Sequence, residues 1–409
     1  MVSCCLLASC TSFDGDKNPY QEQMQTLALR LVYPEEQTDY LRAGVEVKIK
    51  DLQTSNKYTA TTDAEGCLQV QIPLGLYRVS VLDKPERRVV FNGTIEQVSL
   101  IGGDISMDVP LKLVKPGTLV IKEAYFGGCP ALPAAGTYNY DRYVILHNND
   151  IETLYLDSLC LSMVDPYNSY GQSGNYWTET INGQIVYRKY ASVPDCVWYL
   201  AGSGKDFPLE PGADAVVVLN GAVDHTQTYP LSVNLNNCAY FVCYDPTAYS
   251  QPNSVLFHPQ PGNQVLDSHH LKVIKKTGTP TSTTFAVSQN SPAVILFRAP
   301  SDVNLMAYLN DDSQSVVVRG SNSYTMIPWE WIVDGLEVFN KANSMKAKRL
   351  RPDVDAGGVE FSASGRGYTV HRYLDEEATE AAGYTVYTDT NNSSNDFYER
   401  TTQSLHVDL

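Results

Sequence analysis

The sequence predicts an all-β protein made of two antiparallel β-sandwiches. Many short runs alternate apolar and polar residues, which is the pattern of a strand with one buried face and one wet face. Proline, glycine, asparagine and aspartate separate these runs at intervals of roughly ten residues, as is typical of sandwich turns. The chain has 409 residues with 43% hydrophobic content, so it can bury more than one core.

The charge balance excludes one class of partner. The chain carries 46 acidic and 30 basic residues, which gives a formal net charge of −16. Because such a surface repels phosphate backbones, nucleic acid is not expected as a partner. The sequence contains no apolar run of about 18 residues or more, so we expect no helix that spans a membrane.

The first ten residues form a short apolar run that ends in Leu7-Ala8-Ser9-Cys10, and polar residues follow. This pattern is typical of the end of an export signal. Leu7-Ala8-Ser9-Cys10 resembles the bacterial lipobox, which implies that Cys10 is the lipidation site and that residues 1–22 are signal remnant and tether. Each buried methylene of an acyl chain contributes about 0.8 kcal/mol to membrane binding. The alternative is a buried N-terminal strand with incidental cysteines.

The residues after Cys10 indicate in which membrane the lipid-anchored protein is located. Thr11 stands where an aspartate would resemble an inner-membrane retention signal, so the outer membrane is favoured. Asp14 and Asp16 resemble the acidic tract of surface-exposed lipoproteins of Bacteroidota. This resemblance implies an outer-membrane protein that is lipid-anchored at the cell surface, and attachment facing the periplasm stays open.

Residues 23–115 are predicted to form the first sandwich. Asp63 and Gly66 suit a tight turn, and Pro73 and Gly75 suit a strand end. Thr62-Asp63-Ala64-Glu65-Gly66 and Pro73-Leu-Gly75-Leu-Tyr77 resemble the signature of the prealbumin-like, carboxypeptidase regulatory-like domain. The resemblance implies a spacer or interaction module. The alternating runs that predict its strands are 27–33, 45–50, 68–72, 77–81 and 105–109.

Lys115-Pro116-Gly117 interrupts this pattern and marks the predicted start of a second sandwich at residues 117–409. The segment from Glu337 to Lys348 is predicted as a helix, because the cations at its end suit a helix C-terminus. The runs that predict strands here are 118–125, 143–149, 152–156, 207–220, 331–339 and 368–373.

Several motifs in this second part resemble the lamin-tail-like module, an immunoglobulin-like β-sandwich. They include Ile121-Lys-Glu123, Val144-Ile-Leu-His-Asn148, Leu154-Tyr-Leu156-Asp157 and Asp389-Thr-Asn-Asn-Ser-Ser-Asn-Asp396-Phe397. The resemblance implies long insertions, and residues about 163–206 and 244–282 are rich enough in turn residues to leave the sandwich as loops. As a whole, the chain resembles an uncharacterised Bacteroidota lipoprotein family of the domain of unknown function 4876 type, which implies no established activity.

One segment of the sequence is a candidate metal site. Asp389, Asn391, Ser393 and Asp396 carry oxygen side chains at spacings that a tight loop could turn towards one hard cation. The segment resembles a short calcium loop, so Ca²⁺ is the candidate cofactor. It lacks the glycine and the terminal glutamate of an EF-hand, and the same residues are good turn formers without a metal.

Aromatic residues of the first insertion are the candidate ligand-binding residues. Tyr167, Tyr170, Tyr176 and Trp177 lie close together in the sequence. If they are exposed, such rings form a recognition face for sugars, peptides or a partner protein. If they are buried, they are sandwich core, and this alternative stays open. Trp198, Trp329 and Trp331 are predicted as core.

Catalytic motifs are missing from the sequence. It contains no G-x-S-x-G elbow, no H-E-x-x-H helix and no G-x-x-x-x-G-K-S loop, and nothing recommends one pair among its acidic residues as glycosidase carboxylates. Enzymatic activity is therefore not expected. The six cysteines after Cys10 include no C-x-x-C pair, and both disulfides and small buried residues stay open for them.

The sequence as a whole predicts a non-enzymatic cell-surface lipoprotein that binds a ligand or partner through tyrosine-rich loops. The membrane is its partner through the N-terminal lipid anchor. Resemblance to Bacteroidota lipoproteins implies capture of a nutrient or partner for a TonB-dependent outer-membrane transporter. The alternatives are a structural or adhesive surface protein without a small-molecule pocket and, third, a hydrolase.

Overall fold

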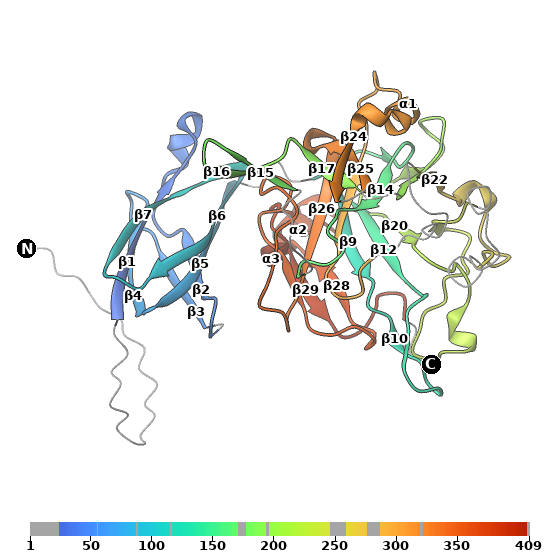
Figure 1. The fold of residues 1–409 in the computed structure, drawn as a ribbon, viewed down its shortest axis with the longest axis horizontal. Helices are drawn as coiled ribbons and strands as arrows, with labels where there is room; N and C mark the ends of the chain where they lie inside the picture. Colours follow the sequence, from blue (N-terminus) through green and yellow to red (C-terminus); the bar gives the residue numbers. More distant parts are fainter. Residues whose placement is uncertain are drawn as a thin grey trace, which may run out of the picture.

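The computed structural model describes residues 24–406 except 55, 87–88, 115–116, 171–176, 194–195, 246–258, 276–286 and 320–321. Strands dominate the described residues, and two β-rich bodies stand side by side (Figure 1). The predicted all-β fold class is confirmed. In the part of the chain that the structure describes, no helix has the length and apolar character needed to cross a membrane.

The N-terminal body packs a five-stranded sheet on a three-stranded sheet. The five-stranded sheet has the order β3-β2-β5-β6-β8, with β2 (Glu46–Asp51), β3 (Lys57–Thr61), β5 (Gly75–Glu86), β6 (Val89–Leu100) and β8 (Lys112–Val114). The other sheet has the order β4-β1-β7, with β1 (Met24–Val32), β4 (Cys67–Pro73) and β7 (Ile105–Pro110). Each of the five runs predicted here coincides with a strand, except that Tyr33 and Val45 fall one residue outside β1 and β2.

One pairing in this body departs from the prediction. β1 pairs with β4 in antiparallel fashion but with β7 in parallel fashion. The chain crosses to the five-stranded sheet between β4 and β7 and returns in the direction of β1. The sandwich is therefore mixed and not wholly antiparallel, because alternation predicts strands and their faces but not the direction of a partner strand.

The predicted turn before β4 forms as its residues suggest. The Asp63 carboxylate accepts hydrogen bonds from the backbone N–H groups of Glu65 and Cys67, and Gly66 adopts a φ of +72°, a conformation that favours glycine. The Tyr77 hydroxyl donates to the carbonyl of Pro73 at 2.6 Å. These bonds fix the entry of β4 and the turn between β4 and β5.

The C-terminal body is built on two facing six-stranded sheets. One has the order β21-β20-β12-β9-β28-β29, with β9 (Leu119–Tyr125), β12 (Tyr143–Asn148), β20 (Asp214–Val218), β21 (Phe241–Val242), β28 (Thr369–Arg372) and β29 (Phe397–Arg400). The other has the order β22-β18-β14-β23-β26-β27, with β14 (Cys160–Met163), β18 (Cys196–Tyr199), β22 (Lys272–Lys275), β23 (Ala293–Phe297), β26 (Ile332–Asn340) and β27 (Val359–Phe361).

Smaller elements cover these two sheets. A three-stranded sheet consists of β17 (Tyr190–Val193), β25 (Asn322–Pro328) and β24 (Ser315–Arg319), in that order. Two-stranded pairs are β10 (Cys129–Pro130) with β11 (Thr137–Tyr138), β13 (Leu154–Tyr155) with β19 (Pro208–Leu209), and β15 (Thr178–Ile181) with β16 (Gln184–Tyr187). The helices are α1 (Leu305–Asn310), α2 (Glu376–Ala382) and α3 (Ser393–Asp396), and short 3₁₀ turns are η1 (Glu35–Tyr40), η2 (His225–Gln227), η5 (Asp267–His269), η6 (Asp312–Gln314) and η7 (Trp329–Trp331).

Burial on both faces explains the continuous apolar strands of this body. Val294 and Leu296 of β23 face the core between the six-stranded sheets, whereas Ile295 and Phe297 face a second core on the other side. A strand that is covered on both faces has no wet side, so its sequence does not alternate. Trp198, Trp329 and Trp331 are buried, as predicted.

The helix predicted from Glu337 to Lys348 is wrong. β26 continues to Asn340, because Leu336 and Val338 pack in the core between the sheets. The cations that suggested a helix C-terminus bind carboxylates instead: Lys346 contacts Glu360, and Arg349 contacts Glu337. A partly buried and a fully buried ion pair, not a helix dipole, therefore explain these positive charges.

The two predicted loop insertions are also corrected in part. Residues 163–206 contain β15, β16, β17 and β18, and β18 is a member of a six-stranded sheet. The described residues of the insertion at 244–282 include β22, which pairs with β18. A high content of tyrosine, serine and glycine did not prevent strand formation, because each segment meets a strand that has hydrogen-bonding groups to pair.

Candidate functional site

One outer face of the N-terminal body is basic. In β2, Val47 and Ile49 point into the core, so the alternating residues Lys48 and Lys50 point outwards. Lys50 lies opposite Lys57 of β3 and opposite Arg78 of β5. Three adjacent strands therefore bring four cationic side chains to one surface of a protein whose net charge is −16.

Two chain segments of the C-terminal body face this basic surface. They are residues 356–360, which lead into β27, and residues 392–399, which include α3 and most of β29. Their close packing requires glycine, because a Cβ atom on Gly357 would lie 2.0 Å from Oδ1 of Asn392. The Ser394 hydroxyl donates to the Gly358 carbonyl and accepts from the Gly358 N–H group, which ties the two segments together.

Polar contacts join the two bodies. Lys50 Nζ lies 2.9 Å from Glu360 Oε1, and Lys346 Nζ lies 2.6 Å from the same oxygen. The Asn92 side chain donates to the Thr390 carbonyl at 2.8 Å. Burial alone would raise the pKa of Glu360, but the hydrogen bonds from Lys346 and Lys50 outweigh it and lower the pKa to about 2. Glu360 is therefore ionised at neutral pH and holds two cations at the junction.

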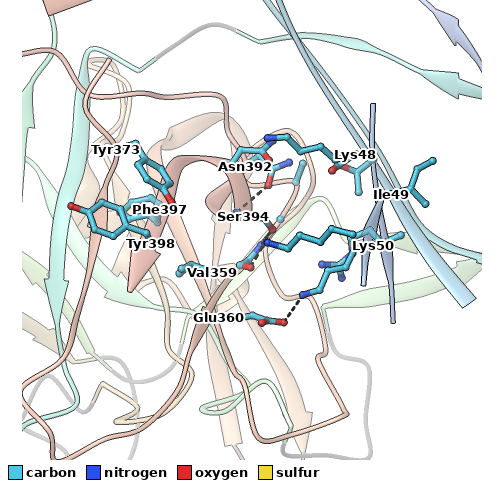
Figure 2. Close-up of a pocket in the computed structure, with 18 of the residues that line it drawn as sticks. Lys48, Ile49, Lys50, Val359, Glu360, Tyr373, Asn392, Ser394, Phe397 and Tyr398 are labelled. Atoms are coloured by element: carbon cyan, nitrogen blue, oxygen red, sulfur yellow. Dashed lines mark hydrogen bonds and ion pairs between the residues drawn. The ribbon is translucent and has the colours of Figure 1, made fainter. Parts of the chain in front are cut away.

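A cavity of about 570 Å³ lies between the two bodies at this junction. We call it the interdomain cleft. In Figure 2, Lys48 and Lys50 extend from the N-terminal sheet towards the C-terminal body, where Lys50 meets Glu360. Its remaining lining includes hydroxyl and amide side chains from both bodies, and the half-exposed ring of Tyr373 lies across from the lysines.

Residues 210–404 match the model of a family described as a protein of unknown function, DUF4876. This segment is therefore similar to the DUF4876 family. The predicted resemblance to that family is confirmed. A crystal structure of a DUF4876 family protein from Bacteroides thetaiotaomicron is similar over 93% of this chain and 96% of that chain, with a TM-score of 0.58 and 21% identity. At this identity the likeness shows the fold alone.

Two further solved structures are less similar. A DUF3823 family protein from Parabacteroides merdae is 12% identical over 45% of this chain and 94% of that chain, with a TM-score of 0.17. A putative adhesin from Bacteroides ovatus is 10% identical over 83% of this chain and 93% of that chain, with a TM-score of 0.20. The comparison with curated proteins gave no match.

The DUF4876 segment contributes only one wall of the interdomain cleft. Residues 356–360 and 392–399 lie inside the segment, whereas Lys48, Lys50 and Lys57 of the opposite wall lie before it. The cleft is therefore a property of the two bodies together, and the basic wall belongs to the part of the chain outside the family match.

The predicted calcium loop lies in the DUF4876 segment, where it surrounds an arginine. Arg372 Nη1 donates to Asp389 Oδ1 at 2.9 Å and lies 3.5 Å from Asp396 Oδ2, and Arg372 Nη2 donates to Asp334 at 2.7 Å. All four of these side chains are buried. Burial raises the pKa of Asp334 and Asp396, and the positive charge of Arg372 opposes this.

The other two residues of that loop have protein partners as well. The Ser393 hydroxyl donates to Asp355 at 2.6 Å, and the Asn391 amide donates to the Asp353 carbonyl at 2.9 Å. Among the described residues, no group of three or more His, Cys, Asp or Glu side chains is arranged to hold a metal ion. The calcium site stays a prediction, and the ion pairs with Arg372 are a sufficient structural role for Asp389 and Asp396.

The described residues of the predicted aromatic set are not among those that line the cleft. Tyr167 is 42% exposed, and its hydroxyl donates to the Val287 carbonyl at 3.0 Å. Tyr170 is half-buried and Trp177 is buried, so these rings do not share one open face. Tyr176 and the predicted lipidation site Cys10 lie outside the described residues. A ligand-binding role for this tyrosine-rich segment stays a prediction.

Sequence reasoning missed the cleft residues. The alternation in 45–50 placed Lys48 and Lys50 on the wet face of a strand, but a wet face is the ordinary place for lysine. The available signal was the cluster of lysines on strands that a short turn connects, in a chain with few basic residues. Cys67, Cys129, Cys160, Cys238 and Cys243 are free, so these five form no disulfide in the structure.

Proposed function

We propose that this protein is a lipid-anchored cell-surface module that binds its ligand in the interdomain cleft and does not convert it chemically. The observation that carries the proposal is the cleft itself. Its volume of about 570 Å³ falls within the range of small-molecule sites, roughly 300 to 1,000 Å³. Both bodies contribute side chains to it, as is common for ligand sites at domain junctions.

The chemistry of the lining supports binding rather than catalysis. No histidine or cysteine is present among the described residues that line the cleft. Its two carboxylates are engaged, since Glu360 holds Lys50 and Lys346 and Glu399 accepts hydrogen bonds from the Ser362 hydroxyl. A general base needs a carboxylate that can reach the substrate proton. Cations, hydroxyl groups and amides suit recognition better.

The cellular setting of the proposal comes from the N-terminus and from the family. Cys10 in its lipobox-like context supports a lipid anchor, and Thr11, Asp14 and Asp16 support the outer-membrane surface. The resemblance to Bacteroidota lipoproteins supports delivery of the bound ligand, as a nutrient, to a TonB-dependent transporter. The expected partners are therefore the membrane and such a transporter.

The anchor and the address are tested together in cells. Radiolabelled palmitate should enter the full-length product and should not enter a Cys10→Ala variant. Protease added to intact cells should then digest the wild-type chain, whereas an internal periplasmic marker survives. Unlabelled product, or digestion only after lysis, would contradict the surface anchor.

Binding in the cleft is tested with one blocking variant and its matched control. Thr59 and Thr61 are both exposed on β3, but only Thr59 lines the cleft. Thr59→Trp should fill the cavity, whereas Thr61→Trp adds the same ring outside it. We expect ligands found in a thermal-shift screen of the full chain to lose their effect in Thr59→Trp and to keep it in Thr61→Trp. Equal behaviour of the two variants would contradict a ligand site in the cleft.

A further inference from the structure

We propose that the interdomain cleft recognises an acidic oligosaccharide, that is, a short sugar chain that bears carboxylate or sulfate groups. This inference rests on the proposed binding function of the cleft and specifies its ligand class. Three properties of the lining support it: an excess of positive charge, a set of neutral hydrogen-bonding groups, and an exposed aromatic ring.

The charge of the lining is opposite to that of the whole chain. Four cationic side chains, Lys48, Lys50, Lys57 and Arg78, face the cavity together with two carboxylates, Glu360 and Glu399. Four positive and two negative charges leave a surplus of two positive charges, whereas the chain carries −16. A cleft lined mainly by one sign of charge focuses the electrostatic potential and attracts ligands of the opposite sign.

Lys48 and Lys57 are the cations best placed for a ligand. Glu360 already binds Lys50, and it also binds Lys346 from outside the lining. The contact of Lys48 with Glu46 is long, 3.9 Å, and both side chains are more than half exposed, so solvent screens it. Lys57 is exposed on the neighbouring strand, opposite Lys50. An anion entering the cleft would therefore meet Lys48 and Lys57 without breaking a buried pair.

The neutral groups favour a sugar over an acidic peptide. A sugar chain presents hydroxyl groups along its whole length, and a hydroxyl binds equally well to hydroxyl and amide side chains because it both donates and accepts. An acidic peptide would use the lysines, but its backbone offers only one N–H and one C=O per residue, fewer hydrogen-bonding groups than the several hydroxyls of each sugar ring. The neutral polar side chains of the lining are Thr59, Ser80, Thr94, Asn392, Ser394 and Asn395.

Tyr373 gives the cleft an aromatic surface. Tyr373 is 47% exposed, and its ring stacks on Tyr398 with centroids 4.6 Å apart and planes 30° apart. The stack holds the ring in place, so a ligand pays little side-chain entropy to pack on it. Tyr373 lies opposite the lysines (Figure 2). This arrangement suits a sugar ring, which offers C–H groups to the aromatic face and its acidic group to the lysines.

The test measures binding of four defined probes to the full chain by calorimetry. The probes are an oligogalacturonate, a sulfated chondroitin oligosaccharide, a neutral galacto-oligosaccharide and a poly-glutamate peptide. The two acidic sugars distinguish a carboxylate from a sulfate source. We expect at least one of them to bind, and we expect its affinity to fall as salt rises from about 0.05 to about 0.5 M, because salt screens charge.

Lysine variants identify the contacts. Lys48→Gln with Lys57→Gln should weaken acidic-sugar binding by about tenfold or more, whereas Lys48→Arg with Lys57→Arg should retain it. The matched control is Lys205→Gln with Lys341→Gln, which removes the same charge at exposed lysines outside the lining and should change affinity less than about twofold. Thermal unfolding of each variant checks that the fold is intact.

Three outcomes would overturn the inference, and they separate it from the proposed function. In the first outcome, neutral and acidic sugars bind with the same affinity, and binding is lost in Thr59→Trp but not in the lysine variant. This result would refute an acidic oligosaccharide as the ligand and would leave the proposed binding function intact. Poly-glutamate that binds more tightly than either acidic sugar through Lys48 and Lys57 would replace the sugar by an acidic peptide. If Thr59→Trp affects no probe and no other ligand, both the inference and the proposed function fail.

Discussion

The ammonium group of Lys50 lies 2.9 Å from the carboxylate of Glu360, and this pair connects residues 310 positions apart in the sequence. It joins the basic face of the N-terminal sheet to the strand β27 of the C-terminal body. Because Lys346 binds the same carboxylate, one anion holds two cations at the junction. The stability of the junction should therefore depend on the charge of Glu360.

Acid should weaken this junction. The pKa of Glu360 falls from an ordinary value of 4.5 to about 2 in the folded chain, so its contribution is present above about pH 4.5 and is lost as the pH falls through about 2. Glu360→Gln should cost about 1 kcal/mol in urea unfolding at pH 7 and should flatten the loss between pH 4.5 and 2. Glu380→Gln, on the exposed side of α2, is the control. An unchanged acid profile in Glu360→Gln would refute this role.

Arg349 should be among the most sensitive positions for folding. Its guanidinium and the carboxylate of Glu337 are both fully buried and 2.7 Å apart, and it also donates to the carbonyls of Pro166 and Ser291. Arg349→Met leaves a buried carboxylate without its main partner, so we expect a loss of about 3 to 5 kcal/mol in chemical denaturation. Lys348→Met removes a neighbouring cation that lies 3.4 Å from the same group and should cost much less. Equal losses would contradict this assignment.

Calcium should not stabilise the loop at residues 389–396. Arg372 already supplies positive charge to Asp389 and Asp396 from a buried position. A second cation would repel that guanidinium, so we expect the same melting temperature in millimolar calcium and in EDTA. Asp389→Asn should lower the melting temperature in both media, because Arg372 and the Gly117 N–H group lose a charged partner. A calcium-dependent rise that disappears in Asp389→Asn would show that the metal site exists.

Gly358 should tolerate no side chain. A Cβ atom there would lie 2.3 Å from the Phe339 ring, which is itself buried in the core. Gly358→Ala should therefore destabilise the fold by about 1 to 3 kcal/mol in denaturant unfolding. Gly102→Ala is the matched control, because a Cβ atom at Gly102 would meet no atom within 4 Å and its φ is not positive. Similar values for both variants would mean that the segment at 356–360 can move.

The sequence predicted the strands better than it predicted their neighbours. Alternation at 45–50 identified β2 and its two faces, because the side-chain period of a strand is local. The meeting of Lys50 with Glu360 could not be predicted, since it depends on how two separately folded bodies dock. The helix prediction at 337–348 failed because of packing within the C-terminal body. Arg349 looked like a helix-terminal cation, but in the structure it binds Glu337 of β26.

The candidate sites show the same limit. Asp389 to Asp396 has the composition of a cation loop, but the cation that it binds in the structure is Arg372 of β28. The local composition indicated that a positive charge lies close to these carboxylates. It did not show whether a metal ion or an arginine side chain supplies that charge. Tyr167 and Trp177 are close in sequence, yet Trp177 is buried whereas Tyr167 is 42% exposed, so these two rings do not form one exposed face.

The hydrophobic cluster of the N-terminal body contains only residues between Leu27 and Leu111, and those of the C-terminal body begin at Leu119. Each body thus has its own hydrophobic core, and the two bodies are linked largely by a few hydrogen bonds and ion pairs. Separating the two bodies would expose mainly charged groups, which water solvates well, and little apolar surface. The two bodies therefore have separate cores, and a ligand that contacts both walls of the cleft would add to the few contacts that hold them together.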